Sequence, residues 1–338
     1  MAKQSLSTTV KRIFLKSGVY DILRRLFPHS EAAILRYHAI VEPEDNFYTS
    51  PSIALSPKLF ETHVKYLSRR YHVLSLDQII DLLHQSKPFP PNSIGFTFDD
   101  GYADNFFAAQ ILHKYHANGT FYITTEPIDR KSRLWLSEII CLILKTEKNQ
   151  LEIFVDGESH IFSFNDQSSK WSAIRQITKI IKSNNQTVRE QIRSEISKKL
   201  GNTLLLNMAA NLMLNWEQVN EMVGMGMLIG SHTLSHLNLP NAEPSNAIKE
   251  IRNSKEVLEK KLNNPVRHFS YPNSGPYEYF DSRIRSYVVD AGYESSTTSQ
   301  QGFVNGKSDL FALQRIRTIP ELSEVIHSLE WDRLFQKV

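Results

Sequence analysis

A short apolar run that ends in two adjacent carboxylates constrains the fold of this 338-residue chain more than any other feature. Residues 93–98 read Ser-Ile-Gly-Phe-Thr-Phe and are followed by Asp99, Asp100 and Gly101. Such near-continuous apolar character is typical of a parallel strand that is buried on both faces. Neighbouring carboxylates repel each other and are costly to bury without a partner of opposite charge. The sequence therefore predicts a buried strand with a chemically active site at its carboxyl end.

Short apolar runs alternate with amphipathic segments over much of the chain. We expect strands at residues 33–37, 73–74, 93–98, 119–124, 227–230, 268–271, 293–297 and 311–316. We expect helices between them at residues 57–67, 77–84, 105–116, 245–262 and 282–291. Repeated strand–helix units favour an α/β fold with parallel strands, whose active sites lie at the carboxyl ends of the strands.

Three segments depart from this alternation. Residues 1–30 are predicted to contain an amphipathic helix (5–27), rich in Lys and Arg, that either docks on the main domain or rests on anionic lipid. Within the main domain, residues 31–320, an insertion at about 130–222 holds a predicted hairpin and charged helices, and we expect it to border the active-site face. Residues 321–338 are predicted to form a C-terminal helix.

The composition excludes several classes of protein. The net charge of +3 comes from 39 basic and 36 acidic residues without a basic stripe, so we expect no nucleic-acid partner. No run approaches the length of a transmembrane helix, and no secretory signal is recognisable. We therefore expect a cytoplasmic protein, with peripheral contact at the inner face of the membrane through residues 5–27 as an option. The lone Cys141 lies in an apolar stretch and is interpreted as an inert, buried thiol.

A second group of polar residues follows the predicted strand at residues 227–230. His232 and His236 are spaced i, i+4, so on a helical turn both imidazoles would face the same way. Together with one carboxylate of Asp99-Asp100 they form an Asp/His/His set for a divalent metal. Zn²⁺ suits these ligands best, and Ni²⁺, Co²⁺ or Fe²⁺ would also fit. Three protein ligands leave a position open for water, and the second carboxylate can act as a general base, so the sequence predicts a metal-assisted hydrolase.

These residues resemble the motifs of a known family, the polysaccharide deacetylases (NodB homology domain, carbohydrate esterase family 4). The first two motifs correspond to Thr-Phe-Asp-Asp-Gly at residues 97–101 and His-Thr-x-x-His at 232–236. Phe-Ser-Tyr-Pro-Asn at 269–273 resembles the third motif. Weaker matches are Leu-Gln-Arg-Ile at 313–316 and Leu-Arg-Tyr-His at 35–38, which are typical of one branch of the family. The resemblance implies a distorted (β/α) barrel with an insertion, and an enzyme that removes an N-acetyl group from an amino sugar in a glycan or a lipid-linked saccharide.

The resemblance also implies a role for each matching residue. Asp100, His232 and His236 would bind the metal, and Asp99 would be the catalytic base. Arg315 would pair with Asp99 and keep it charged and oriented. The backbone N–H of Asn273 would help to bind the oxyanion, and Tyr271 and Pro272 would contact the substrate. His38 would be the general acid that protonates the leaving amine.

The chain departs from the family pattern in ways that leave alternatives open. Ser270 stands where an Arg is common in the third motif, so Arg315 would supply that charge instead. The general acid could also be His327, in a late segment that looks like a surface helix, or His268, beside the third motif. The same motifs would serve a deacylase or deformylase of non-sugar amides, or an inactive glycan-binding module. One of Trp135, Trp171 and Trp216 could stack on a sugar ring rather than pack in the core.

Overall fold

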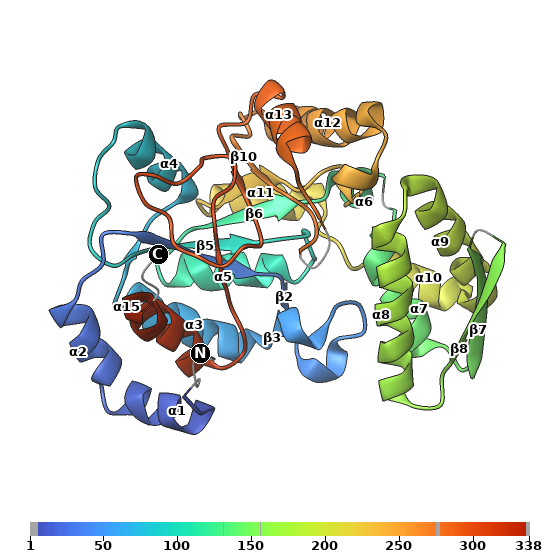
Figure 1. Ribbon diagram of the computed structural model, residues 1–338, viewed down its shortest axis with the longest axis horizontal. Coiled ribbons are helices and arrows are strands. Elements are labelled where there is room, and N and C mark those ends of the chain that lie inside the picture. Colours follow the sequence, from blue (N-terminus) through green and yellow to red (C-terminus); the bar gives the residue numbers. More distant parts are fainter. Residues whose placement is uncertain (1–5, 131, 156, 275–277, 336–338) are drawn as a thin grey trace.

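One curved parallel sheet organises the main domain (Figure 1). The computed structural model describes residues 6–130, 132–155, 157–274 and 278–335. In these residues the sheet has the strand order β11-β10-β9-β6-β5-β1-β12, and β4 also pairs with β5. The strands are β1 (Ala32–Tyr37), β4 (His72–Val73), β5 (Ser93–Phe98), β6 (Gly119–Ile123), β9 (Leu228–Ser231), β10 (His268–Ser270), β11 (Ser295–Thr297) and β12 (Ile316–Arg317).

Strand β5 lies at the centre of the sheet, as its apolar sequence predicts. All six of its residues are buried, and it pairs in parallel with β1 from Ser93 opposite Ala32 to Phe98 opposite Tyr37. The ring of Phe98 stacks on Phe121 of β6 at a centroid distance of 4.4 Å. Burial of both faces fixes the register of β5 and therefore the position of the carboxylates that follow it.

The two ends of the sheet approach each other through the segment before β12. The predicted strand at 311–316 is regular only at β12, which pairs with β1. Leu313 bridges to β11 instead: its N–H donates to the Ser296 carbonyl at 3.0 Å, and its carbonyl accepts from the Thr298 N–H at 2.9 Å. Because this short segment bonds to β11 at one end of the sheet and continues into β12 at the other end, the sheet curves into the distorted (β/α) barrel that the motifs imply.

Helices cover the sheet, and α3, α4, α5, α12 and α13 lie where their amphipathic spacing predicts them, whereas α6 and α11 were not predicted. Ser56 caps α3, where its Oγ accepts from the Leu59 N–H at 3.3 Å, and Ser75 forms a capping box with Gln78 at the start of α4. The barrel helices are α3 (Pro57–Ser68), α4 (Leu76–His84), α5 (Asn105–Lys114), α6 (Thr125–Asp129), α11 (Trp216–Gly224), α12 (Pro244–Leu262) and α13 (Ser282–Asp290). Short elements complete this domain: β2 (Ala39–Ile40), β3 (Ala54–Leu55), η1 (Pro43–Asp45), η2 (Pro51–Ile53) and η3 (Leu239–Asn241).

The insertion forms a lobe beside the barrel, drawn in green at the right of Figure 1. It contains α7 (Trp135–Lys145), the antiparallel hairpin β7 (Gln150–Val155) and β8 (Glu158–Ser163), α8 (Gln167–Ser183), α9 (Gln186–Leu200) and α10 (Thr203–Ala210). It ends earlier than the predicted boundary near residue 222. The Leu214 N–H donates to the Gly101 carbonyl at 3.1 Å, so the chain has already returned to the barrel. Helix α11 contacts α5 and β9 and therefore belongs to the barrel.

The N-terminal segment is two helices rather than the single helix predicted for residues 5–27. Helix α1 (Thr8–Lys16) and helix α2 (Val19–Leu26) are separated at Gly18, which has a φ of 78°. A left-handed residue interrupts helical hydrogen bonding, and glycine adopts this conformation at little cost. The chain turns there, so α1 and α2 lie against the end of the main domain instead of extending as one rod (Figure 1).

The C-terminal segment is an irregular helix that packs on α1 and α2. It consists of α14 (Leu322–His327), the π-helical turn η4 (Ser328–Asp332) and α15 (Arg333–Phe335), while residues 336–338 of the predicted helix lie outside the described residues. The expectation of a surface helix around His327 is wrong, because its side chain is buried and its Nδ1 lies 2.9 Å from the Tyr20 hydroxyl. None of the helices in the described ranges is long and apolar enough to cross a membrane.

Gly230 in β9 is required by a close approach between strands. A Cβ atom at this position would lie 2.5 Å from Cδ1 of Tyr122, whose ring is fully buried. We expect Gly230→Ala to lower the free energy of unfolding by about 1–3 kcal/mol, because the ring cannot move without disturbing the packing around it. Chemical denaturation measures this loss.

Gly224→Ala is the matched control for this prediction. Gly224 is the last residue of α11, and a Cβ there would meet no atom within 4 Å. Its substitution is expected to leave the free energy of unfolding unchanged or to raise it by up to about 1 kcal/mol. Equal losses in the two variants would contradict the close approach.

Candidate active site

The predicted site residues converge at the carboxyl ends of β1, β5, β9 and β10. Asp99 and Asp100 follow β5 directly, and Asp100 and Gly101 both have left-handed φ values, 81° and 82°. The two left-handed residues turn the chain sharply, so the adjacent carboxylates contact different residues: Asp99 faces Arg315, and Asp100 faces the histidines. Both carboxylates are buried, which requires a compensating partner for each of them.

Asp100, His232 and His236 form a compact ligand set. Oδ1 of Asp100 lies 3.5 Å from Nε2 of His232 and 3.4 Å from Nε2 of His236. One ligand atom from each residue lies within 4.8 Å of the other two, and all three side chains are buried. Two imidazole nitrogens and one carboxylate oxygen at this spacing suit a divalent cation that binds both nitrogen and oxygen ligands.

The histidines converge by a different route from the predicted helical turn. They lie in a loop after β9, in which Thr233 and His236 have left-handed φ values of 67° and 56°. The Thr233 hydroxyl accepts from the His236 N–H at 3.0 Å and closes the turn. The expectation of a helix was wrong because the i, i+4 spacing does not distinguish a helical turn from a loop held by a side-chain hydrogen bond.

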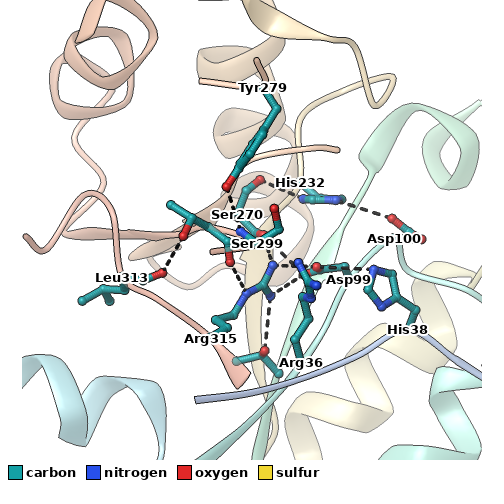
Figure 2. Close-up of polar contacts among 12 residues, drawn as sticks. Arg36, His38, Asp99, Asp100, His232, Ser270, Tyr279, Ser299, Leu313 and Arg315 are labelled. Atoms are coloured by element: carbon teal, nitrogen blue, oxygen red, sulfur yellow. Dashed lines mark hydrogen bonds and ion pairs between the residues drawn. The ribbon is translucent and has the colours of Figure 1, made fainter. Parts of the chain in front are cut away.

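Neighbouring groups orient the ligand residues. Nδ1 of His232 lies 2.7 Å from the Ser270 carbonyl oxygen, so this nitrogen carries the proton and Nε2 is left with a lone pair facing Asp100 (Figure 2). The indole Nε1 of Trp135 donates to the His236 carbonyl at 3.1 Å, which ties the histidine loop to the insertion. Burial opposes ionisation of Asp100, but the neighbouring imidazoles of His232 and His236 hold its pKa well below the usual range. The chemistry and orientation of these donors therefore fit a resident cation.

Asp99 is held by Arg315 in a bidentate ion pair. Nη1 and Nη2 of Arg315 each lie 2.7 Å from one carboxylate oxygen of Asp99 (Figure 2). The guanidinium also donates to the Thr298 carbonyl at 2.8 Å and to the Ser270 hydroxyl at 3.2 Å. Burial alone would raise the pKa of Asp99, but the charge of Arg315 holds it well below the usual range. Arg315 thus brings a positive charge to both Asp99 and Ser270, the residue that stands where the third motif often has an Arg.

His38 lies on the open side of Asp99. Its Nε2 is 3.7 Å from Oδ2 of Asp99, and its side chain is 17% exposed in the site cavity. Burial lowers the pKa of His38 to about 4, against the opposing effect of the two aspartates. The alternatives for this role lie elsewhere: Nε2 of His268 contacts Asp77 at 2.8 Å, and His327 contacts Tyr20.

The third motif contributes Asn273 to the site and uses Tyr271 and Pro272 mainly for packing. Asn273 has a left-handed φ of 74°, and neither polar atom of its buried amide has a hydrogen-bond partner among the described residues. Tyr271 lines the cavity but stacks on Phe280 and donates its hydroxyl to the Phe311 carbonyl. Pro272 is buried and is not among the residues of the cavity wall, so its substrate contact stays a prediction.

A cavity of about 260 Å³ joins these groups and includes residues that the sequence did not single out. Besides Asp99, Asp100, His38, His232 and His236, its wall contains Arg36, Ser52, Ile53, Leu136, Lys182, Ser274 and Arg317. Leu136 and Lys182 come from α7 and α8, so the insertion closes one side of the site. Only their packing over the barrel shows this, because no local sequence signal connects them to the distant motifs.

Removing Arg315 should destabilise the protein through Asp99. In Arg315→Met the carboxylate stays buried without its partner, and we expect a loss of about 3–5 kcal/mol in the free energy of unfolding. In the double variant Asp99→Asn/Arg315→Met no charge is stranded, so the loss should be clearly smaller than in Arg315→Met alone. Urea denaturation of the wild type, both single variants and the double variant measures the coupling. Additive losses would show that the two side chains do not stabilise each other.

Comparison with known proteins identifies the family. Residues 86–296 match the family model described as polysaccharide deacetylase. YxkH of Bacillus subtilis (strain 168), whose name groups it with these proteins, is 22% identical over 292 residues, covering 86% of this chain and 72% of YxkH.

Solved structures share the fold at low identity. The deacetylase PplD of Streptococcus pyogenes, solved with acetate, has a TM-score of 0.59 and 20% identity, with 90% of this chain and 99% of PplD covered. IcaB from Ammonifex degensii has a TM-score of 0.55 and 14% identity, with coverages of 89% and 97%. Such similarity shows the distorted (β/α) barrel. The family-model match extends over more than half of the sequence, and the chain therefore belongs to the polysaccharide deacetylase family.

Proposed function

We propose that this protein is a metal-dependent hydrolase that removes the N-acetyl group from an amino sugar within a saccharide. The observation that carries the proposal is the convergence, in one cavity, of an Asp/His/His ligand set and a separate, Arg-paired carboxylate. A purely binding module would need the ligand set at most, since an ionised base beside it serves no binding purpose. The family membership supports the same class of reaction.

The ligand set defines where the chemistry takes place. Asp100, His232 and His236 would hold the divalent cation, with Zn²⁺ as the first choice and Ni²⁺, Co²⁺ or Fe²⁺ as alternatives. When bound, such a cation polarises the amide carbonyl and makes a nearby water more acidic. Asn273 is suited to orient the acetamido group, because its buried side-chain amide has no protein partner in the described chain and its backbone N–H lies in the same turn.

Asp99 and His38 are arranged to carry one proton from water to the leaving nitrogen. Arg315 keeps Asp99 ionised, and burial keeps His38 neutral near pH 7, so the pair enters the reaction with a vacant proton site. Asp99 accepts the proton of the attacking water, and His38, whose Nε2 is 3.7 Å from Oδ2 of Asp99, is placed to pass it on. Transfer to nitrogen accompanies cleavage of the C–N bond, which releases acetate and the free amine.

Asp99→Asn tests this assignment directly. We expect the rate of acetate release from N-acetylhexosamine oligomers to fall by roughly 10²–10⁴-fold, because the asparagine cannot accept a proton. Metal content, measured by mass spectrometry of the purified protein, should be retained because Asp100, His232 and His236 are unchanged. Chelator treatment of the wild type should also abolish acetate release, and Zn²⁺ or Co²⁺ should restore it.

Matched variants separate proton transfer from general disturbance. His38→Ala should lose activity over a similar range, whereas His160→Ala, in strand β8 of the insertion, should behave as the wild type. Near-native activity of Asp99→Asn would refute the proposed base. If the wild type retains metal and hydrolyses formamides or other amides, but releases no acetate from N-acetylhexosamine oligomers, the non-sugar deacylase is favoured. Metal binding with no hydrolysis at all would favour the glycan-binding module.

We also propose that helices α1 and α2 contact a membrane surface containing anionic lipid. Their inner face holds charged as well as apolar side chains: beside the buried Tyr20, Nζ of Lys11 pairs with Glu324 at 2.7 Å, and the buried Arg24 pairs with Asp21 and Glu330. Their outer side exposes large apolar side chains that are 52–66% accessible, namely Ile13, Ile22, Leu26 and Phe27. Residues 6–27 also carry five basic side chains and one acidic side chain. Exposed apolar groups flanked by cations match the interfacial zone of an anionic bilayer.

Charged substitutions at exposed positions test the membrane contact without disturbing the fold. Ile22→Glu/Leu26→Glu is expected to weaken co-sedimentation with phosphatidylglycerol vesicles by more than tenfold, since each buried aliphatic side chain contributes about 1.5–3 kcal/mol. The control is Ile161→Glu, which alters an equally exposed side chain on the hairpin of the insertion. Unchanged sedimentation of the double variant would count against the contact.

A further inference from the structure

A second, larger cavity adjoins the catalytic cavity. It has a volume of about 850 Å³, within the usual range for small-molecule sites. Its wall shares Ser52, Ile53, Leu136 and Lys182 with the catalytic cavity. The two cavities are therefore neighbours, and these four shared residues form the border between them. The second cavity is called the insertion groove below, since α7 and α8 of the insertion provide most of its wall.

The floor of the insertion groove is apolar. Trp171 and Ile174, spaced i, i+3 on α8, line it together with Leu136 and Ile140, spaced i, i+4 on α7. Ile53, from the short turn η2, completes the apolar surface at the border with the catalytic cavity. Aliphatic side chains offer no hydrogen bonds to sugar hydroxyls but favour hydrocarbon, at about 0.8 kcal/mol for each buried methylene, which is roughly a fourfold gain in affinity.

The groove also carries a row of cations. Arg175, Lys179 and Lys182 are spaced i, i+4, i+7 along α8, so they lie on one face of the helix. The described lining residues of the groove include no Asp or Glu. Lys182 stands at the border of the two cavities, while Arg175 and Lys179 are exposed along the groove. The charge therefore favours an anion placed between the catalytic cavity and the apolar floor.

We propose that the insertion groove binds the prenyl chain and phosphate of a lipid-linked saccharide, so that the amino sugar reaches the catalytic cavity while still attached to its lipid carrier. This assignment rests on the proposed function and specifies its substrate class. A lipid-linked sugar has three parts in a fixed order: the sugar, the phosphate and the hydrocarbon. The structure presents a metal-ligand site, the Lys182 border and an apolar groove in the same order.

Binding of farnesyl phosphate by calorimetry, below its micelle concentration, tests the groove without requiring catalysis. We expect farnesyl phosphate to bind at least tenfold more tightly than geranyl phosphate, which has five fewer carbons, and more tightly than farnesol, which lacks the anion. Inorganic phosphate alone should bind weakly. The double variant Arg175→Ala/Lys179→Ala, at exposed positions, should weaken the binding of farnesyl phosphate about tenfold or more and leave the affinity for farnesol unchanged.

Control variants locate the binding site. Lys198→Ala removes an exposed lysine from α9, and Ile22→Glu/Leu26→Glu alters the apolar face of α2, so both should bind farnesyl phosphate as the wild type does. Trp171→Ala should weaken the binding of farnesyl phosphate and of farnesol to the same extent, because it removes part of the apolar floor and no charge. Farnesyl phosphate affinity that depends on α2 instead of α8 would overturn the proposal.

The outcomes separate the groove from the proposed function. If farnesyl phosphate does not bind, but N-acetylhexosamine oligomers bind and depend on Trp171, the groove is a saccharide subsite and the lipid assignment is wrong while deacetylation stands. If farnesyl phosphate binds through Arg175 and Lys179 but no saccharide releases acetate, the groove stands and the proposed function falls. If the wild type neither binds farnesyl phosphate nor releases acetate from a saccharide, both the lipid assignment and the proposed function are refuted.

Discussion

The buried ion pair between Arg315 and Asp99 is the interaction on which the rest of the site depends. A buried pair compensates its desolvation only when the geometry is good and the remaining donors are satisfied. Here both carboxylate oxygens accept from the guanidinium, and the other donors reach Thr298, Thr97 and Ser270. These contacts connect the loop after β5 with β10 and the end of β11. The charge state of Asp99 is therefore coupled to the closure of the barrel, because Arg315 follows the segment that joins β11 to β12.

The site also contains several residues with strained backbone conformations. Asp100, Thr233, His236 and Asn273 all have left-handed φ values, which cost energy in residues other than glycine. Each lies directly after a strand or in the loop that follows it, so regular hydrogen bonding of the sheet fixes one end of every strained turn. The barrel thus compensates for local strain and delivers three ligand side chains to one point.

The sequence predicted the parts of the fold that follow from periodicity and the parts of the site that follow from motifs. Buried strand β5 and the capped helix α3 were recognisable because burial and capping leave local signals. The break at Gly18 was missed because the amphipathic spacing continues across it, and the loop at His232 and His236 mimics helical spacing. The contributions of Leu136 and Lys182 were out of reach, since they arise from packing between segments with no common pattern.

The N-terminal helices place cations on the side that faces the main domain and leave large apolar side chains on the other side. Helix α2 buries Arg24 together with Tyr20, whereas Ile22 and Leu26 are exposed. This orientation holds Arg24 inward through Asp21, Glu330 and the ring of Tyr71. Lys11 is held inward in the same way by Glu324. Ion pairs thus compensate for the burial of two cations beside Tyr20, so burial of charge and exposure of Ile22 and Leu26 occur on the same helix. The proposed lipid contact would cover these exposed side chains, in the phase in which a prenyl-linked saccharide would be presented to the insertion groove.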